Sequence, residues 1–211
     1  MSPPEPTTPR RPQCLICARP RPACLCAWTR PTDNAVELLV LQHPLEAREA
    51  KNSARLLALS LRHCRIEVGE VFDPTALAAW TTGAALLYPA TESAPGPAVP
   101  AGWTPRRLVV LDATWRKSLK LLHLNPALQA LPRWALVDPP AGRYAPLRRA
   151  ARPHQLSTLE ASCHALAQIE GDTARYAPLL DAFAGWVDGQ AAERSARELR
   201  ATCATRGPVR A

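Results

Sequence analysis

Four cysteines near the amino terminus have the spacing of a metal site. Cys14, Cys17, Cys24 and Cys26 form a C-x2-C-x6-C-x-C pattern within thirteen residues. Four thiolates can close a tetrahedron around Zn²⁺, and the metal would order a segment with too little apolar surface to fold alone. The alternatives are unliganded thiols or a redox CxxC pair, whose usual βαβ setting is absent. The pattern therefore predicts a structural zinc site.

A second candidate centre lies where an apolar strand runs into a basic helix. Residues 108–111 (LVVL) form a continuous apolar run, as in a parallel strand buried on both faces, and Asp112 follows directly. Open α/β sheets place ligand groups at the carboxyl ends of their strands, which makes Asp112 a candidate site residue. The same carboxylate can instead cap the following helix, and position alone does not separate the two roles.

Two further segments supply polar and aromatic groups. Residues 88–89 (YP) end a short apolar strand, and residues 157–160 (STLE) begin a helix after a loop. Serine followed three residues later by glutamate is a capping box, which by itself can explain both residues. If the fold brings these segments beside Asp112, Thr114 and Trp115, they form a crevice with hydroxyls, a carboxylate and an aromatic wall. Such a crevice suits a nucleoside-bearing cofactor.

The positive charge of the chain is concentrated in one segment. The chain has 26 Lys+Arg against 18 Asp+Glu, a net charge of +8. Residues 106–152 contain ten basic and two acidic residues, so this segment carries the whole excess. Such a concentration is typical of a polyanion-binding surface, with nucleic acid as the first candidate. A merely solvated basic face is the alternative.

The elements that would position these groups alternate between strands and helices. The predicted strands are residues 36–41, 65–71, 84–89, 108–111 and 134–137. The predicted helices are residues 46–62, 74–80, 115–122, 126–131, 157–170 and 175–188. Alternation with short connections predicts an α/β fold with a mostly parallel sheet.

The composition divides the chain into four predicted parts. Residues 1–13 are proline-rich and expected to be disordered, and residues 14–33 form the cysteine segment. Residues 34–188 form the α/β domain, and residues 189–211 a charged tail. No apolar run approaches the roughly 18 residues of a membrane span, and the amino terminus has no signal-peptide core. A cytoplasmic protein without a membrane partner is therefore expected.

Several common active sites are missing from the sequence. It contains no GxGxxG after a strand, no GxxxxGK[ST] phosphate loop and no GxSxG nucleophile elbow. Its histidines do not pair at metal-ligand spacing. These absences argue against an ordinary dinucleotide site, an NTPase, an α/β-hydrolase and a catalytic metal.

The order of the motifs resembles the DTW-domain family, the tRNA-uridine aminocarboxypropyltransferases. Residues 112–115 (DATW) match its D-x-T-W signature. The other matching motifs are the cysteine pattern with its Arg-Pro, residues 43–44 (HP), 51–52 (KN), 55–56 (RL), 87–89 (LYP) and 157–161 (STLEA). The resemblance covers about residues 14–185, and the order and spacing of these motifs together are specific. Ser53 stands where the family would have threonine, and it keeps the hydroxyl.

The resemblance implies a fold and a reaction. Members have an α/β fold similar to the SPOUT methyltransferases, with a C-terminal trefoil knot. They transfer the 3-amino-3-carboxypropyl group of S-adenosylmethionine to N3 of a uridine in tRNA. The expected partner is therefore tRNA and not DNA, while the oligomeric state is left open.

The resemblance also assigns roles to residues of this chain. Asp112 is the expected catalytic residue, either as a base for the N3 proton or as an organiser of its loop. The expected cofactor-binding residues are Leu87, Tyr88, Pro89, Leu111, Asp112, Thr114, Trp115, Ser157, Thr158 and Glu160. The expected RNA-binding residues are Lys51, Asn52, Arg55, Arg116, Lys117, Arg143, Arg148 and Arg149.

Two other functions remain open at this point. A SPOUT-type RNA methyltransferase would share the fold and the cofactor and differ in the carbon that is attacked. A non-catalytic, zinc-bearing RNA-binding protein would use the basic segment alone.

Overall fold

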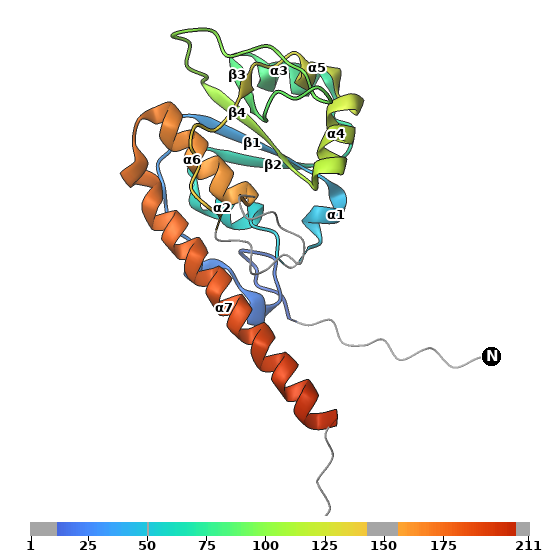
Figure 1. Ribbon diagram of the computed structural model, residues 1–211, viewed down its shortest axis with the longest axis vertical. Coiled ribbons are helices and arrows are strands. Elements are labelled where there is room, and N and C mark those ends of the chain that lie inside the picture. Colours follow the sequence, from blue (N-terminus) through green and yellow to red (C-terminus); the bar gives the residue numbers. More distant parts are fainter. Residues whose placement is uncertain (1–11, 50, 143–155, 206–211) are drawn as a thin grey trace, which may run out of the picture.

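A parallel five-stranded sheet forms the centre of the structure, a computed structural model that describes residues 12–49, 51–142 and 156–205 (Figure 1). The strands are β1 (Glu37–Gln42), β2 (Cys64–Val68), β3 (Ala84–Leu87), β4 (Arg107–Asp112) and β5 (Arg133–Trp134). Their order across the sheet is β2-β1-β4-β3-β5, and every neighbouring pair is parallel. This confirms the predicted α/β fold with a mostly parallel sheet.

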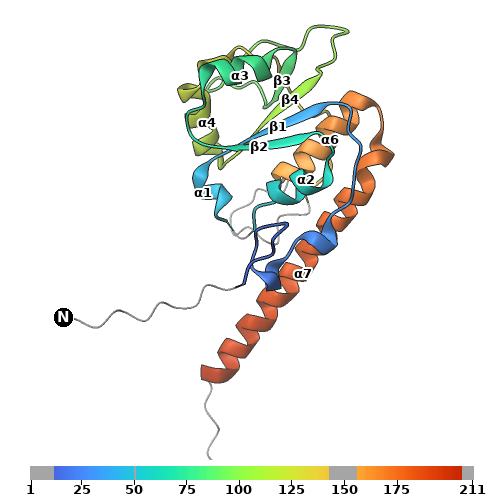
Figure 2. The same cartoon turned by 180° about the vertical axis from the view of Figure 1, so that it is seen from behind.

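Helices cover both faces of the sheet (Figures 1 and 2). One face carries α3 (Pro74–Thr81), α4 (Trp115–Leu124) and α5 (Pro126–Gln129), and the other carries α2 (Ala54–Ser60), α6 (Thr158–Glu170) and α7 (Thr173–Thr205). Successive residues of β1 alternate between the two hydrophobic cores. Leu38 and Val40 pack toward α2, α6 and α7, while Leu39 and Leu41 pack toward α3, α4 and α5. Burial on both faces is why the strands read as continuous apolar runs.

The cysteine segment packs into the core beside α7. It contains two short 3₁₀ helices, η1 (Arg21–Ala23) and η2 (Cys26–Trp28). Cys17 and Leu25 are buried in the same core as Tyr176 and Phe183. The segment is thus joined to the α/β domain by apolar packing.

The predicted single helix over residues 46–62 is wrong. The structure has two helices there, α1 (Pro44–Ala47) and α2, with a turn between them. The Asn52 side-chain oxygen accepts a hydrogen bond from the Ala54 backbone N–H at 3.0 Å, which begins α2 at that point. Asparagine often competes with helix hydrogen bonding in this way, so the apolar stripe overestimated the helix length.

The last helix is longer than predicted. It continues to Thr205, whereas the sequence predicted an end at residue 188. Residues after 188 are rich in alanine, arginine and glutamate, which are strong helix formers, and Arg194 and Glu198 form an i,i+4 ion pair at 3.7 Å.

Two expectations depend on segments beyond the described ranges. The trefoil knot requires the course of residues 143–155, and the predicted disorder concerns residues 1–13, of which only two are described. Both stay predictions. Among the helices that the structure describes, none is long and apolar enough to cross a membrane.

Two glycines of α7 give a matched test of this packing. A Cβ on Gly185 would lie 2.8 Å from the Trp28 ring, whereas a Cβ on Gly189 would meet nothing within 4 Å. We expect Gly185→Ala to destabilise the protein by about 1–2 kcal/mol, because the rigid ring must move. Gly189→Ala should stabilise it by up to about 1 kcal/mol through helix propensity. Urea denaturation measures both, and equal stabilisation by the two substitutions would contradict this packing.

Candidate functional site

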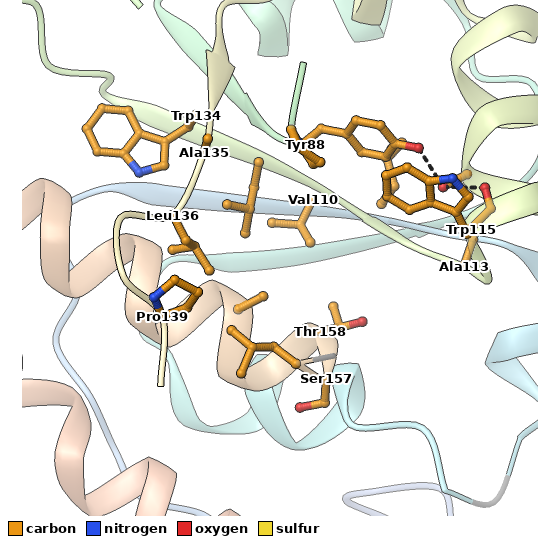
Figure 3. Close-up of a pocket in the computed structure, with 16 residues that line it drawn as sticks. Tyr88, Val110, Ala113, Trp115, Trp134, Ala135, Leu136, Pro139, Ser157 and Thr158 are labelled. Atoms are coloured by element: carbon orange, nitrogen blue, oxygen red, sulfur yellow. Dashed lines mark hydrogen bonds between the residues drawn. The ribbon is translucent and has the colours of Figure 1, made fainter. Parts of the chain in front are cut away.

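The carboxyl ends of the strands meet the start of α6 around a cavity of about 430 Å³ (Figure 3). Seven of the predicted cofactor-binding residues line it: Leu87, Tyr88, Pro89, Leu111, Trp115, Ser157 and Thr158. Asp112, Thr114 and Glu160 are not among the lining residues. The cavity is largely apolar, with a few hydroxyls, as small-molecule sites are.

Asp112 lies just behind the cavity wall and is 3 % exposed. One carboxylate oxygen, Oδ2, accepts hydrogen bonds from the Gln42 side-chain amide and the Asn52 side-chain amide, both at 2.6 Å. The other oxygen, Oδ1, accepts one from the Thr158 hydroxyl, also at 2.6 Å. The carboxylate therefore joins β1, β4, the turn before α2 and the start of α6.

The sheet register explains one of these contacts. Gln42 is the direct neighbour of Asp112 across the β1–β4 pair, and both are the last residues of their strands. Local patterns in the sequence do not give the order of the strands, so this contact was not predicted. Asn52 is one of the predicted RNA-binding residues, and its side-chain amide donates to Asp112; its role in RNA binding stays a prediction.

A capping box fixes the start of α6. The Ser157 hydroxyl oxygen accepts from the Glu160 backbone N–H at 3.2 Å, and the Glu160 carboxylate accepts from the Ser157 backbone N–H at 2.8 Å. This geometry gives Glu160 the capping role that its spacing indicated. It also holds Thr158, the first residue of the helix, against Asp112.

Two stacked aromatic rings form one wall of the cavity. The rings of Tyr88 and Trp115 are 4.9 Å apart at an interplanar angle of 12°, and Trp115 is still 49 % exposed. The Tyr88 hydroxyl is hydrogen-bonded to the Ser118 hydroxyl at 3.1 Å, and burial raises the pKa of Tyr88. The sequence analysis missed Ser118, although it lies one helical turn after Trp115. An exposed, fixed indole of this kind can stack on a planar ligand ring.

Trp134 provides a polar group whose partner is missing. It lies at the end of β5, next to β3, and lines the cavity (Figure 3). Its indole Nε1 is buried and has no hydrogen-bond partner within the described part of the chain. Buried donors are normally satisfied, so this N–H is a candidate donor to a ligand bound in the cavity. Sequence reasoning missed Trp134 because it could not place β5 beside β3.

The four cysteines of the amino-terminal segment converge as predicted. Their sulfur atoms all lie within 4.8 Å of one another, and the Cys14–Cys26 and Cys17–Cys24 sulfur distances are both 3.7 Å. Four sulfurs at about 2.3 Å from a tetrahedral zinc ion would be about 3.8 Å apart. Backbone N–H groups of Cys17 and Ile16 lower the pKa of Cys14 to about 6, whereas the side-chain hydrogen bond with Cys24 raises the pKa of Cys26 to about 12. A bound metal cation favours the thiolate form of its cysteine ligands. The donor set thus fits Zn²⁺.

The predicted RNA-binding residues have different surroundings. Arg116 is exposed at the start of α4, and Lys117 forms an ion pair with Glu46 at 3.0 Å. Arg55 donates a hydrogen bond to the Ile16 carbonyl at 2.9 Å, and Lys51 is half-buried. The remaining three, Arg143, Arg148 and Arg149, lie outside the described residues. An RNA-binding role for these side chains remains a prediction.

Comparison with known proteins gives one family match and several relatives. The family model of the DTW domain matches residues 11–191. The chain is 28 % identical over 177 residues to the "tRNA-uridine aminocarboxypropyltransferase 2" of Macaca fascicularis. It is 30 % identical over 179 residues to the protein of the same name from Drosophila melanogaster.

These matches cover 76 % of this chain, 57 % of the macaque protein and 68 % of the fly protein. The chain therefore spans little more than half the length of the macaque relative. No solved structure gives a significant match.

The cysteine cluster makes a direct prediction about metal content. Cys17→Ser and Cys24→Ser should each lose the bound zinc and lower the melting temperature by roughly 5–10 °C, as expected for a loss of about 3 kcal/mol. Cys64→Ser is the control, because Cys64 lies in β2 and is not part of the cluster. Elemental analysis of the purified proteins gives the zinc content. Equal zinc in all three variants would show that these sulfurs do not hold the metal.

Proposed function

The chain belongs to the DTW domain family, and we propose that it transfers the 3-amino-3-carboxypropyl group of S-adenosylmethionine to N3 of a uridine in tRNA. The main observation behind this proposal is the position of the family's D-x-T-W signature, residues 112–115, beside the cavity. Asp112 and Trp115 flank the one cavity described above, where the strand ends meet α6. The names of the relatives supply the substrate and the transferred group.

The cavity has the features that an adenosine-bearing ligand requires. Leu87, Leu111 and Leu136 offer apolar surface, and the Tyr88–Trp115 pair offers a ring to stack on. The orphan N–H of Trp134 can donate to an oxygen of the ligand. The Ser157 hydroxyl already accepts a bond from Glu160, so its own hydrogen is available for a second polar contact.

When bound, S-adenosylmethionine supplies an electrophilic carbon next to its sulfonium, and the thioether leaves neutral. The site therefore needs no acid at the leaving group, and its main task is to orient that carbon toward uridine N3. In the proposed reaction the C–N bond to N3 would form as the C–S bond breaks, the thioether would leave, and the N3 proton would pass to solvent.

Asp112 organises this site and is not its base. It lies behind the lining residues, and three of the roughly four acceptor positions of a carboxylate are already in use. Through Thr158 it fixes the start of α6, which forms the wall opposite the strand ends. A base must reach the N3 proton of the uridine, and the buried position of Asp112 and its three donors favour the organising role over that of the base.

The tRNA substrate would be held beside the mouth of the cavity. Arg116 follows Trp115 and is exposed, so it can contact a phosphate of the tRNA. Arg143, Arg148 and Arg149 belong to the same predicted phosphate-binding set. These three arginines lie outside the residues that the structure describes.

The central test combines the reaction with two variants of Asp112. Unmodified bulk tRNA is incubated with S-adenosylmethionine, and the nucleosides are analysed by mass spectrometry. We expect a uridine that gains the aminocarboxypropyl mass. A methyl gain would indicate a methyltransferase, and firm tRNA binding without any product would indicate a binding protein.

In the same assay, Asp112→Asn should retain measurable turnover. Its affinity for the cofactor should stay within about tenfold of that of the parent. Its carbonyl oxygen can still accept from Gln42 and Asn52, and its amide can donate to the Thr158 hydroxyl. Asp112→Ala should lose both properties, because three donors then lack their acceptor. Full cofactor affinity without any turnover in Asp112→Asn would instead identify Asp112 as the base.

The orphan donor gives a second prediction. Trp134→Phe should weaken S-adenosylmethionine binding by roughly tenfold, the expected effect of one lost hydrogen bond in a dry site. Its melting temperature should fall no further than that of Trp103→Phe, since both changes remove the same ring volume beside the core and the Trp134 N–H has no partner within the described chain. Trp103→Phe is the control, because Trp103 packs against the core and does not line the cavity. Calorimetry measures the affinity for S-adenosylmethionine. Unchanged affinity in Trp134→Phe would show that the Trp134 N–H does not contact the cofactor.

A further inference from the structure

Two hydrogen bonds in opposite directions join the cysteine segment to the turn before α2 and to the first turn of α2. The Arg19 guanidinium donates to the Asn52 backbone carbonyl, and the Arg55 guanidinium donates to the Ile16 backbone carbonyl. Ile16 lies between the first two cysteines of the cluster, and Arg19 follows the second by two residues. The turn and the cysteine loop therefore fix each other.

The same turn faces Asp112 on its other side. The Asn52 side-chain amide donates to Asp112, and the Asn52 side-chain oxygen accepts from Gln42 at 3.2 Å and from the Ala54 N–H. One residue thus has its backbone held by the cysteine segment and its side chain held in the Asp112 network. Ser53 adds a second contact, since its hydroxyl accepts from the Leu159 N–H of α6 at 3.4 Å.

The cysteine cluster can transmit its order to Arg19. The Arg19 backbone carbonyl accepts from the Cys14 N–H at 2.7 Å, so the backbone at Arg19 is fixed within the loop that the four sulfurs close. Its guanidinium also lies 5.8 Å from the centre of the Trp186 ring, on α7. A metal ion that orders the loop therefore also orders the donor that reaches Asn52.

We propose that the cysteine segment is part of the active-site scaffold, with Arg19 as a positioning residue that holds the Asn52 turn and, through it, the Asp112–Thr158 wall of the cofactor cavity. This rests on the proposed function for the identity of the cofactor. The positioning itself rests only on the hydrogen bonds just described. Arg19 acts through Asn52 and touches neither cofactor nor uridine.

The turn needs such support because it belongs to neither a helix nor a strand. The Asn52 backbone N–H bonds to the Glu49 carbonyl at 3.0 Å, but the Asn52 carbonyl has the Arg19 guanidinium as its donor. Without Arg19 the turn can move away from Asp112. Asp112 would then lose the hydrogen bond from Asn52, and its carboxylate would be less firmly fixed as the acceptor for the Thr158 hydroxyl.

The test compares two arginines of the same segment. Arg19→Ala removes the bond to Asn52, whereas Arg21→Ala removes the same charge from an exposed position two residues later. Both full-length, zinc-loaded variants are compared with the parent for zinc content, melting temperature, tRNA binding and S-adenosylmethionine affinity. Amide hydrogen exchange is measured on the peptides that contain Ala54 and Leu159.

We expect Arg19→Ala to keep its zinc and its tRNA binding, and to bind S-adenosylmethionine roughly tenfold more weakly. Exchange at Ala54 and Leu159 should rise by a similar factor, since their acceptors lie on Asn52 and Ser53. Arg21→Ala should match the parent in every measurement. If Arg19→Ala does not fold or loses its zinc, Arg19→Lys replaces it and should shift exchange in the same direction.

The outcomes separate the two proposals. Parent-like exchange and cofactor affinity in a zinc-loaded Arg19 variant would overturn the positioning role. An equal loss of affinity in Arg21→Ala would do the same, because the effect would then be one of charge. A parent protein that binds no S-adenosylmethionine would refute the proposed function, while the exchange measurement would still decide the role of Arg19.

Discussion

The structure depends on satisfying one buried carboxylate. Taking a carboxylate out of water costs several kcal/mol unless hydrogen bonds replace the lost hydration. Asp112 meets this requirement with three short bonds to neutral donors from three separate parts of the chain. Because no cation partners it within the described residues, each donor must lie accurately in place. The need to solvate Asp112 therefore fixes β1, the Asn52 turn and α6 relative to β4.

The parallel sheet makes this arrangement possible. All strands end at the same edge, so residues distant in sequence meet there without long loops. The β1–β4 register sets Gln42 beside Asp112, and the capping box sets Thr158 at the tip of α6. The apolar residues before Asp112 alternate between two cores and hold the end of the strand rigidly. The cavity walls follow from these constraints, and the aromatic pair is added by Trp115 of α4 and Tyr88, the residue after β3.

The sequence was sufficient for much of the fold and part of the site. Apolar runs located the strands, and the capping box located α6, because both signals are local. The cysteine cluster was predictable because its ligands lie within one short segment. Strand order is a non-local property, so the Gln42–Asp112 contact and Trp134 beside β3 were missed. The contact of Asn52 with Asp112 was also missed, because an apolar stripe does not show where a side chain interrupts a helix.

The order of the Asp112 partners along the chain has a consequence for biosynthesis. A ribosome releases the strands first, and Thr158 emerges only 46 residues after Asp112. Until α6 docks, the nascent chain must keep the end of β4 in contact with water, and one face of the sheet lacks its main cover. Formation of the core on that face and completion of the cavity thus coincide in one late step of synthesis. A chain released before α6 can complete neither.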